Sequence, residues 1–417
     1  MIQRYRRPMD RCRLLPLAVS LLVGLGTGCS LLDPPRPTAT PMPPTTVPSP
    51  FPTARPTPTP TPTPVPPKEL TICQRDEPNT LFIYGGPSRA ARNVLDAVYD
   101  GPIDRRDYTL EPVILESVPS LENGAAVVRT VWVGQEDRVL DAQDEVVELL
   151  PETTVYDAQG DEVVFGGDVI SMTQMVVTFT LRADVTWADG EPLTSEDSWF
   201  SFQLAGQLDD AALHRRLDRT ASYEVADSRT VVWTGVPGYR DSYYPLNFYH
   251  PLPQHVIGGA GADQLLETEQ VHRRPLGWGP FVVETWDEGD QITLLRNPHY
   301  FRAAEGLPRL DRVTYLFVDD PQQAMEKLRT GECDVLAEDL VDPVEPGSLL
   351  EVVESEGVRL VSSPSSEWEH LDFGIQPASW SGRITFFDRR AVRQALAHCV
   401  DRERLALEAF VLTDATL

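Results

Sequence analysis

The chain is poor in residues that bind metals or act as nucleophiles. Of its 417 residues, 5 are cysteines and 7 are histidines. The cysteines show no C-x-x-C spacing, which argues against a zinc site; they are Cys12, Cys29, Cys73, Cys333 and Cys399. The histidines are scattered, and no H-E-x-x-H motif occurs. We therefore predict neither a bound metal nor a cofactor.

Motifs of common catalytic sites are missing as well. The sequence has no G-x-S-x-G element and no phosphate-cradling glycine loop. Its 63 acidic residues leave a glycosidase-type pair of carboxylates as an open alternative. We predict that the protein is not an enzyme and keep a secreted hydrolase as the less favoured alternative.

Basic residues are scarce relative to acidic ones. The 36 lysines and arginines stand against 63 aspartates and glutamates, which gives a formal net charge of −27. A field of this sign repels a phosphate backbone, so we exclude nucleic acid as a partner. The charge also keeps the protein soluble, but it does not identify a ligand.

Long apolar runs are few, and the clearest one lies near the N-terminus. LLPLAVSLLVGLG (14–26) follows five arginines and is shorter than the roughly 20 residues of a membrane span, but it suits a secretory signal. Residues 1–28 are therefore expected to be a signal peptide. The small residues before Cys29 resemble a bacterial lipobox, although Gly26 stands where that motif has leucine. We expect Cys29 to carry a lipid, with ordinary secretion as the alternative.

Residues 29–67 contain dense proline and threonine, including the run TPTPTPTPVPP. Such prolines cannot donate backbone hydrogen bonds and favour an extended polyproline II conformation. The segment is predicted to be a tether that holds the folded part, residues 68–417, away from a membrane.

The folded part begins with alternating element types. ELTICQ (69–74) is a candidate strand, and residues 89–99 place Ala91, Val94, Leu95 and Val98 on one face of a helix. Gly101-Pro102 should end that helix. Residues 127–165 alternate valines with polar residues between turns, which predicts short antiparallel strands.

The segment VTFTLRADVTWADGEPLTSEDSWFSFQLA (177–205) predicts a strand, a turn and a capped helix. Val177, Phe179 and Leu181 alternate with polar residues. Asp189-Gly190 supplies the turn, Thr194 is a candidate N-cap, and Asp197 lies at the capping-box position. Trp199, Phe202 and Ala205 have the spacing needed to pack the helix on a sheet.

The same segment resembles the signature of the family 5 extracellular solute-binding proteins, the peptide and nickel receptors of ABC importers. Further similar elements follow in the family's order: PLPQH (251–255), PLGWGPF (275–281), LLRNPHY (294–300), LRTGECDV (328–335) and DRRAVRQALAHCVDRER (388–404). The resemblance covers nearly all of residues 69–410. One departure is Trp278, which stands where the family often has a small residue.

The resemblance implies an α/β, two-lobed fold of the type II periplasmic-binding-protein kind with mixed sheets. We expect lobe I with a subdomain in residues 68–310 and the start of lobe II in residues 311–417. Because family members continue well beyond this point, the second lobe is expected to be incomplete. The expected missing part includes the aspartate that pairs with a peptide's α-amino group in peptide-binding members.

The function implied by the resemblance is that of a substrate-binding subunit. The expected partners are a small solute, most often a peptide, and the permease and ATPase subunits of an importer on the extracytoplasmic face of the membrane. The alternative from another class is a stalked adhesion or structural module, which would predict repeats; none is evident in the folded part. Candidate ligand-binding aromatics are Tyr84, Tyr99, Trp278, Trp368 and Phe373.

Outside the cytoplasm two of Cys73, Cys333 and Cys399 can form a disulfide. The sequence leaves the choice of pair open, and Cys333 with Cys399 is the pairing we favour.

Overall fold

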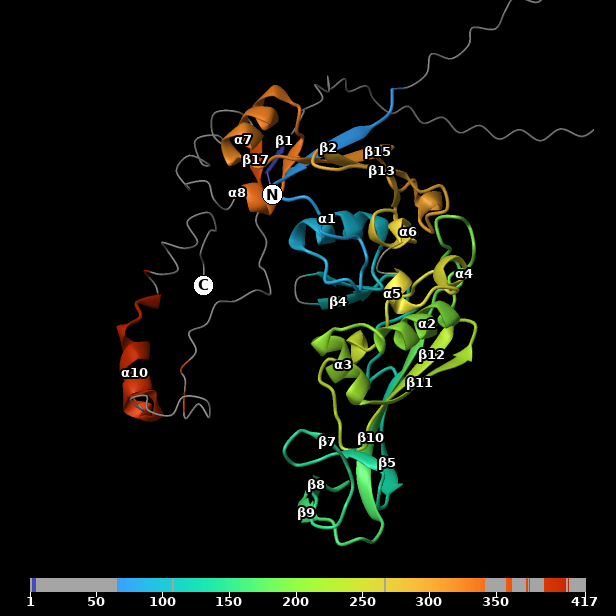
Figure 1. The fold of residues 1–417 in the computed structure, drawn as a ribbon, viewed down its shortest axis with the longest axis vertical. Coiled ribbons are helices and arrows are strands. Elements are labelled where there is room, and N and C mark those ends of the chain that lie inside the picture. The colour runs from blue at the N-terminus through green and yellow to red at the C-terminus, as the bar shows by residue number, and fades with distance from the viewer. Residues whose placement is uncertain are drawn as a thin grey trace, which may run out of the picture. The chain divides into compact units, whose positions relative to one another are not determined.

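The computed structural model describes residues 2–4, 66–106, 109–265, 268–341, 358–361, 373, 375, 386–402 and 404. Two sheets organise the described part of the chain (Figure 1). The structure therefore has the mixed α/β class that the sequence predicts.

The larger sheet has seven strands in the order β13-β14-β15-β2-β16-β1-β17. β2 is parallel to both of its neighbours, β15 and β16, whereas the other pairs are antiparallel. The bounds are Ile2–Arg4 (β1), Glu69–Gln74 (β2), Phe281–Asp287 (β13), Gln291–Arg296 (β14), Arg312–Phe317 (β15), Val335–Leu336 (β16) and Val358–Leu360 (β17). The sheet spans both sides of the domain boundary expected at residue 310.

Strand β1 belongs to the segment for which the sequence predicts a signal peptide. It pairs with β16 and β17, an arrangement that the sequence analysis did not anticipate. The predicted division of the chain into leader, tether and two lobes stays a prediction.

The smaller sheet has four antiparallel strands in the order β11-β12-β10-β5. Its strands are Ala126–Val133 (β5), Ile170–Thr180 (β10), Thr220–Asp227 (β11) and Thr230–Gly235 (β12). Val177 and Phe179 of β10 are fully buried, and Leu181 just beyond it is 1% exposed, as their alternation predicts. The strand begins earlier than residue 177 because its N-terminal half pairs along the full length of β5.

Three two-stranded hairpins complete the strands: β3–β4 (Ile103–Arg106 and Thr109–Pro112), β6–β7 (Arg138–Leu140 and Val146–Glu148) and β8–β9 (Thr154–Tyr156 and Glu162–Val164). Residues 127–165 thus form short antiparallel strands, as predicted.

The last two hairpins are a short internal repeat, DAQ-DEVV and DAQGDEVV, which corrects the expectation that the folded part has none. In both, the first aspartate accepts hydrogen bonds of 2.9 Å from two backbone N–H groups: Asp141 from Gln143 and Glu145, and Asp157 from Gln159 and Asp161.

Helices cover the sheets (Figure 1). α1 packs on β13, and α2 packs on β11 and β12. Among the described residues the α-helices are Arg89–Val98 (α1), Ser195–Ala205 (α2), Ala211–Asp218 (α3), Gln254–Ile257 (α4), Ala262–Leu265 (α5), Glu269–His272 (α6), Pro321–Thr330 (α7), Glu338–Val341 (α8) and Arg390–Cys399 (α10). The same part of the chain contains 3₁₀ turns at Tyr244–Leu246 (η1), Ala303–Glu305 (η2) and Phe386–Asp388 (η3). The predicted helix 89–99 is confirmed, with Ala91, Val94, Leu95 and Val98 buried.

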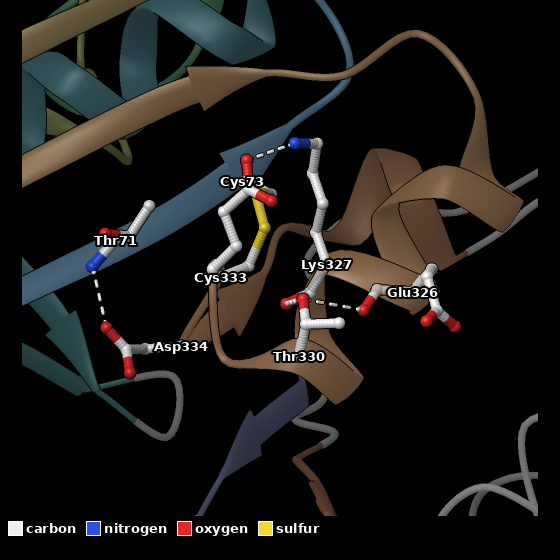
Figure 2. Close-up of a disulfide and its surroundings, with 8 residues drawn as sticks. Thr71, Cys73, Glu326, Lys327, Thr330, Cys333 and Asp334 are labelled. Atoms are coloured by element: carbon white, nitrogen blue, oxygen red, sulfur yellow. Dashed lines mark hydrogen bonds and ion pairs between the residues drawn. A yellow bond between two sulfur atoms is a disulfide. The ribbon is translucent and has the colours of Figure 1, made fainter.

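The predicted disulfide pair is wrong. Cys73 of β2 bonds Cys333 (Figure 2). Cys399, on α10, is a free and exposed thiol. The reason is strand pairing: β16 lies next to β2, so the turn before β16 brings Cys333 to a Cα–Cα distance of 5.8 Å from Cys73. Asp334 strengthens the same contact by accepting a 3.0 Å hydrogen bond from the Thr71 N–H (Figure 2).

Candidate functional site

Four of the motifs that carry the family resemblance meet around Trp187. We call this cluster, made of Trp187, Asp189, His255, Trp278 and His299, the signature junction. Trp187 is fully buried, and its ring lies 5.4 Å from the Trp278 ring and 6.2 Å from the His255 ring. Trp187 and His299, the first and last of these residues, are more than a hundred positions apart in the sequence, so only folding brings the cluster together.

The turn at Asp189-Gly190 forms the exposed edge of the signature junction. Asp189 Oδ2 accepts a 2.8 Å hydrogen bond from His255 Nε2. Partial burial alone would raise the pKa of Asp189, but hydrogen bonds from the His255 ring and the Glu191 N–H outweigh it and lower the pKa. Gly190 has φ +95°, and a Cβ there would lie 3.2 Å from the His299 ring. The turn therefore requires glycine for both backbone and packing reasons.

Asp197 joins the signature junction to α2. Its carboxylate is 5% exposed and accepts hydrogen bonds from the Thr194 N–H (2.9 Å), Trp187 Nε1 (3.3 Å) and the Gln254 N–H (3.2 Å). The sequence predicts the capping contact with Thr194 but not the two long-range donors. These contacts of a buried carboxylate fix α2 against the turn of its own motif and against the PLPQH motif at residues 251–255.

The α2 helix buries a polar face that the sequence analysis missed. Trp199, Phe202 and Ala205 pack on the core as predicted, the first two only partly buried. Ser198 is fully buried beside them, and its Oγ lies 2.7 Å from the Tyr223 hydroxyl and donates to the Tyr249 carbonyl at 2.6 Å. The available signal was the three-residue spacing of Ser195, Ser198 and Ser201, which places all three serines on one face of the helix.

Trp278 and its flanking glycines pack against the end of α1. A Cβ on Gly277 would lie 2.1 Å from the Val98 carbonyl oxygen, and Trp278 Nε1 donates to the Asp100 carbonyl at 2.8 Å. Trp278 is fully buried and lies 4.9 Å from the ring of Tyr99. The close approach of backbone to backbone therefore explains why glycines flank Trp278.

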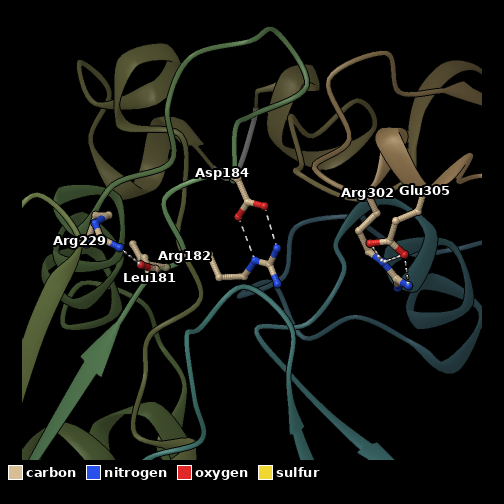
Figure 3. Close-up of polar contacts among 6 residues, drawn as sticks. All are labelled: Leu181, Arg182, Asp184, Arg229, Arg302 and Glu305. Atoms are coloured by element: carbon tan, nitrogen blue, oxygen red, sulfur yellow. Dashed lines mark hydrogen bonds and ion pairs between the residues drawn. The ribbon is translucent and has the colours of Figure 1, made fainter.

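Arg182 makes a second link between the two sheets, because it follows β10 of the smaller sheet and contacts Phe301, which follows β14 of the larger sheet. It forms two hydrogen bonds to the Asp184 carboxylate, of 2.9 and 2.7 Å (Figure 3). Its guanidinium also stacks over the Phe301 ring at 5.1 Å. Nearby, Arg229 donates to the Leu181 carbonyl, and Arg302 pairs with Glu305 (Figure 3).

Of the other predicted ligand-binding residues, Tyr99 lies beside Trp278, whereas Tyr84 and Phe373 make the contacts given below with other residues. Tyr84 is partly buried, donates to the His250 carbonyl at 2.8 Å and has its pKa raised by burial. Tyr99 is 8% exposed, and burial raises its pKa too. Phe373 lies 5.2 Å from Phe387. Trp368 and Cys29 lie outside the described residues. The ligand-binding role of all five aromatics and the lipidation of Cys29 stay predictions.

Hollows in the described part of the chain lie against α3 and share Arg215 and Arg219 in their lining. One, of about 780 Å³, is lined by α3 and the β6–β7 hairpin, and the other, of about 770 Å³, by α3, Trp233 and residues 239–247. In the same part of the chain, no helix is long and apolar enough to cross a membrane, and no three His, Cys, Asp or Glu side chains are grouped to hold a metal.

Comparison with known proteins defines the class. The family model described as "Bacterial extracellular solute-binding proteins, family 5 Middle" matches residues 168–413, more than half of the chain. The protein is therefore a solute-binding protein by class. It belongs to family 5 of the bacterial extracellular solute-binding proteins.

Individual relatives match this chain at low sequence identity. A Brucella ovis protein named for peptide binding in an ABC transporter is 28% identical over 259 residues, covering 60% of this chain and 45% of its own length. The oligopeptide-binding protein AppA of Bacillus subtilis is 26% identical over 233 residues, covering 54% and 39%. The AppA structure with a nonapeptide has a TM-score of 0.47 at 19% identity, covering 70% of this chain and 47% of that one. The chain spans about half the length of the curated relatives it matches.

Proposed function

We propose that this chain is the substrate-binding subunit of an ABC importer that captures peptides or similar small solutes. The observation that carries the proposal is the family match over residues 168–413, together with the packing of four family motifs at the signature junction. AppA, a matched relative, is an oligopeptide-binding protein, which favours peptides over sugars, opines or nickel chelates as the solute.

In the proposed mechanism the protein performs no chemistry on the solute. Two lobes close on it, exclude water and present a surface to the permease. Trp187 of the signature junction acts as rigid support together with Asp197, since both side chains are buried and Trp187 Nε1 donates a hydrogen bond to the Asp197 carboxylate. Ligand contacts are assigned to Tyr84, Tyr99, Trp278, Trp368 and Phe373, and attachment to the membrane to a lipid on Cys29.

The test is calorimetric titration of the 417-residue chain with pools of peptides, followed by mass spectrometry of the peptides. Saturable binding with the peptides recovered intact supports the proposal. Phe373→Ala should weaken binding, whereas Phe386→Ala, an exposed aromatic that also contacts Phe387, should not. Absence of binding by peptides and by the other solutes named above refutes the proposed function, and hydrolysis of the peptides favours an enzyme.

Membrane attachment is tested separately in a bacterial host. Cys29→Ser should abolish labelling with a radioactive fatty acid and release the protein from the membrane fraction, while Cys12→Ser serves as the matched control in the same leader. Labelling that survives Cys29→Ser contradicts the anchor.

The two-hairpin repeat favours the alternative, a stalked surface module. Repeat architectures, however, need three or more units to bury a continuous core. The two hairpins instead bury Val139, Leu149 and Val155 against Val133 and Met172 of the smaller sheet. The repeat is therefore better explained as an extension of that sheet.

A further inference from the structure

The hollow of about 770 Å³ beside α3 combines positive charge with aromatic walls. Its lining includes Arg215, Arg216 and Arg219 from one helix and its C-cap, together with Trp233, Tyr239, Tyr243, Asp241 and Asn247. Three cations gathered in one hollow stand out in a chain whose formal net charge is −27. A concave site with few convergent polar groups and aromatic walls has the usual anatomy of a small-molecule site.

Two of the arginines are held in place by the protein. Arg219 Nη2 donates to Asp144 Oδ2 at 2.6 Å, and its guanidinium lies 5.1 Å from the centroid of the Tyr239 ring. Arg216 donates to the Leu246 carbonyl at 3.0 Å and stacks 4.0 Å over the Tyr249 ring. Fixed guanidinium groups lose little further freedom when they bind an anion.

Arg215 is the third cation and is differently placed. It is exposed, lies four residues before Arg219 on the same helix face, and its guanidinium makes no hydrogen bond or ion pair with any described residue. Its donors are therefore available to a ligand. A guanidinium presents donors in a planar fork that matches a carboxylate.

The one carboxylate in the lining is already engaged. Asp241 Oδ1 accepts from the Tyr243 N–H at 2.7 Å, and Oδ2 accepts from Asn247 Nδ2 at 2.8 Å. Because Asp144 outside the lining already pairs with Arg219, Arg215 and Arg216 stand against this single aspartate and leave the hollow with a formal excess of one positive charge. Tyr239 and the 69% exposed Tyr243 offer ring faces on which a planar group can stack.

We propose that this hollow binds a small aromatic carboxylate, with the carboxylate on the α3 arginines and the ring against the tyrosines. The same chemistry is found in a free aromatic acid and in a peptide that ends in an aromatic residue with its free C-terminal carboxylate. The site consists of residues 211–247 only and does not depend on the proposed solute-binding function.

The first experiment titrates the 417-residue chain with sodium benzoate by calorimetry, at constant ionic strength. We expect saturable binding with a dissociation constant on the order of 1 mM, because so small a ligand makes few contacts. Benzamide, which keeps the ring but lacks the charge, and acetate, which keeps the charge but lacks the ring, should each bind at least about fivefold more weakly. Equal binding of benzamide, or no saturable heat with benzoate up to about 50 mM, overturns the proposal.

The second experiment compares variants. Arg215→Gln should raise the benzoate dissociation constant about fivefold, as expected for the loss of one charge-assisted contact at an exposed site, and leave thermal stability unchanged because Arg215 has no partner to lose. Arg309→Gln, an exposed arginine far along the chain, is the matched control and should leave binding unchanged. Unchanged binding by Arg215→Gln, or equal losses in both variants, overturns the assignment.

A dipeptide ending in phenylalanine and its C-terminal amide then distinguish the two sources. Tighter binding of the free-acid peptide than of benzoate identifies a peptide terminus as the ligand, and tighter binding of benzoate identifies a free acid. Loss of discrimination between the peptide acid and its amide contradicts carboxylate recognition altogether.

Discussion

The backbone N–H of Gly279 donates a 2.8 Å hydrogen bond to the carbonyl of Val98, the last residue of α1. This bond joins the segment just before β13 of the larger sheet to α1, the helix that packs on β13. The two backbones approach so closely that a Cβ on Gly279 would lie 2.5 Å from that carbonyl oxygen. The motif glycines around Trp278 are thus part of the scaffold.

Gly277→Ala should destabilise the protein strongly. Its Cβ would lie 2.1 Å from the Val98 carbonyl oxygen, so the α1 end must shift, and we expect the free energy of unfolding to fall by about 2–4 kcal/mol. Urea unfolding followed by tryptophan fluorescence measures the change. Gly259→Ala is the control, since nothing lies within 4 Å of a Cβ there. Equal stability of the two variants contradicts the close approach.

Removal of the Cys73–Cys333 disulfide should also lower stability. The bond closes a loop with a sequence separation of 260 residues, and its loss should cost about 2–5 kcal/mol of unfolding free energy. Cys73→Ser and Cys333→Ser should therefore unfold at lower urea concentration, while Cys399→Ser, at a free exposed thiol, should not. Peptide mapping without reduction provides the direct check, and a Cys333–Cys399 linked peptide would show that the pairing is wrong.

Asp197→Ala should be far more damaging than a surface substitution. It leaves the Trp187 Nε1 and the Thr194 and Gln254 N–H groups without their acceptor in a buried site, so we expect a loss of about 2–4 kcal/mol. Glu196→Ala, the exposed neighbour on the same helix turn, is the matched control and should lose less than about 1 kcal/mol. Chemical unfolding of both variants measures the two losses of unfolding free energy.

The Arg182–Asp184 pair should make stability depend on pH in acid. Its hydrogen bonds lower the pKa of Asp184 below the ordinary value of 3.8. The unfolded state therefore takes up the proton first as the pH falls, and the pair's contribution, present above pH 3.8, disappears as the pH falls through the lower folded pKa. Because both side chains are 40% or more exposed, this contribution is under about 1 kcal/mol.

Asp184→Asn isolates the effect of this pair. At pH 6 the free energy of unfolding of this variant should be lower than that of the unsubstituted protein. The difference between the two should shrink towards zero near pH 2. Asp168→Asn, at an exposed aspartate with no ion pair to a described residue, should show no such trend. A stability difference that stays constant from pH 6 to pH 2 would show that the pair does not titrate as its geometry indicates.

Local pattern determined much of the fold. The strand at residues 69–74, the α1 helix with its buried Val94 and Val98, and the hairpins of residues 127–165 follow from periodicity and turn residues alone. The strand, turn and capped helix of residues 177–205 follow in the same way, since each depends on neighbours a few positions away. The ordered motifs also sufficed to indicate the family.

Tertiary structure alone decided which distant residues meet. The parallel pairing of β2 with β16 selected Cys73 as the partner of Cys333, and the approach of the α1 end to residues 277–279 made Gly277 and Gly279 packing positions. Tertiary structure likewise decided that Gln254 donates to Asp197 and that Arg219 lies over the Tyr239 ring. Sequence pattern records the period of one element, whereas these contacts depend on the register and approach of elements separated by long stretches of chain, which no local pattern encodes.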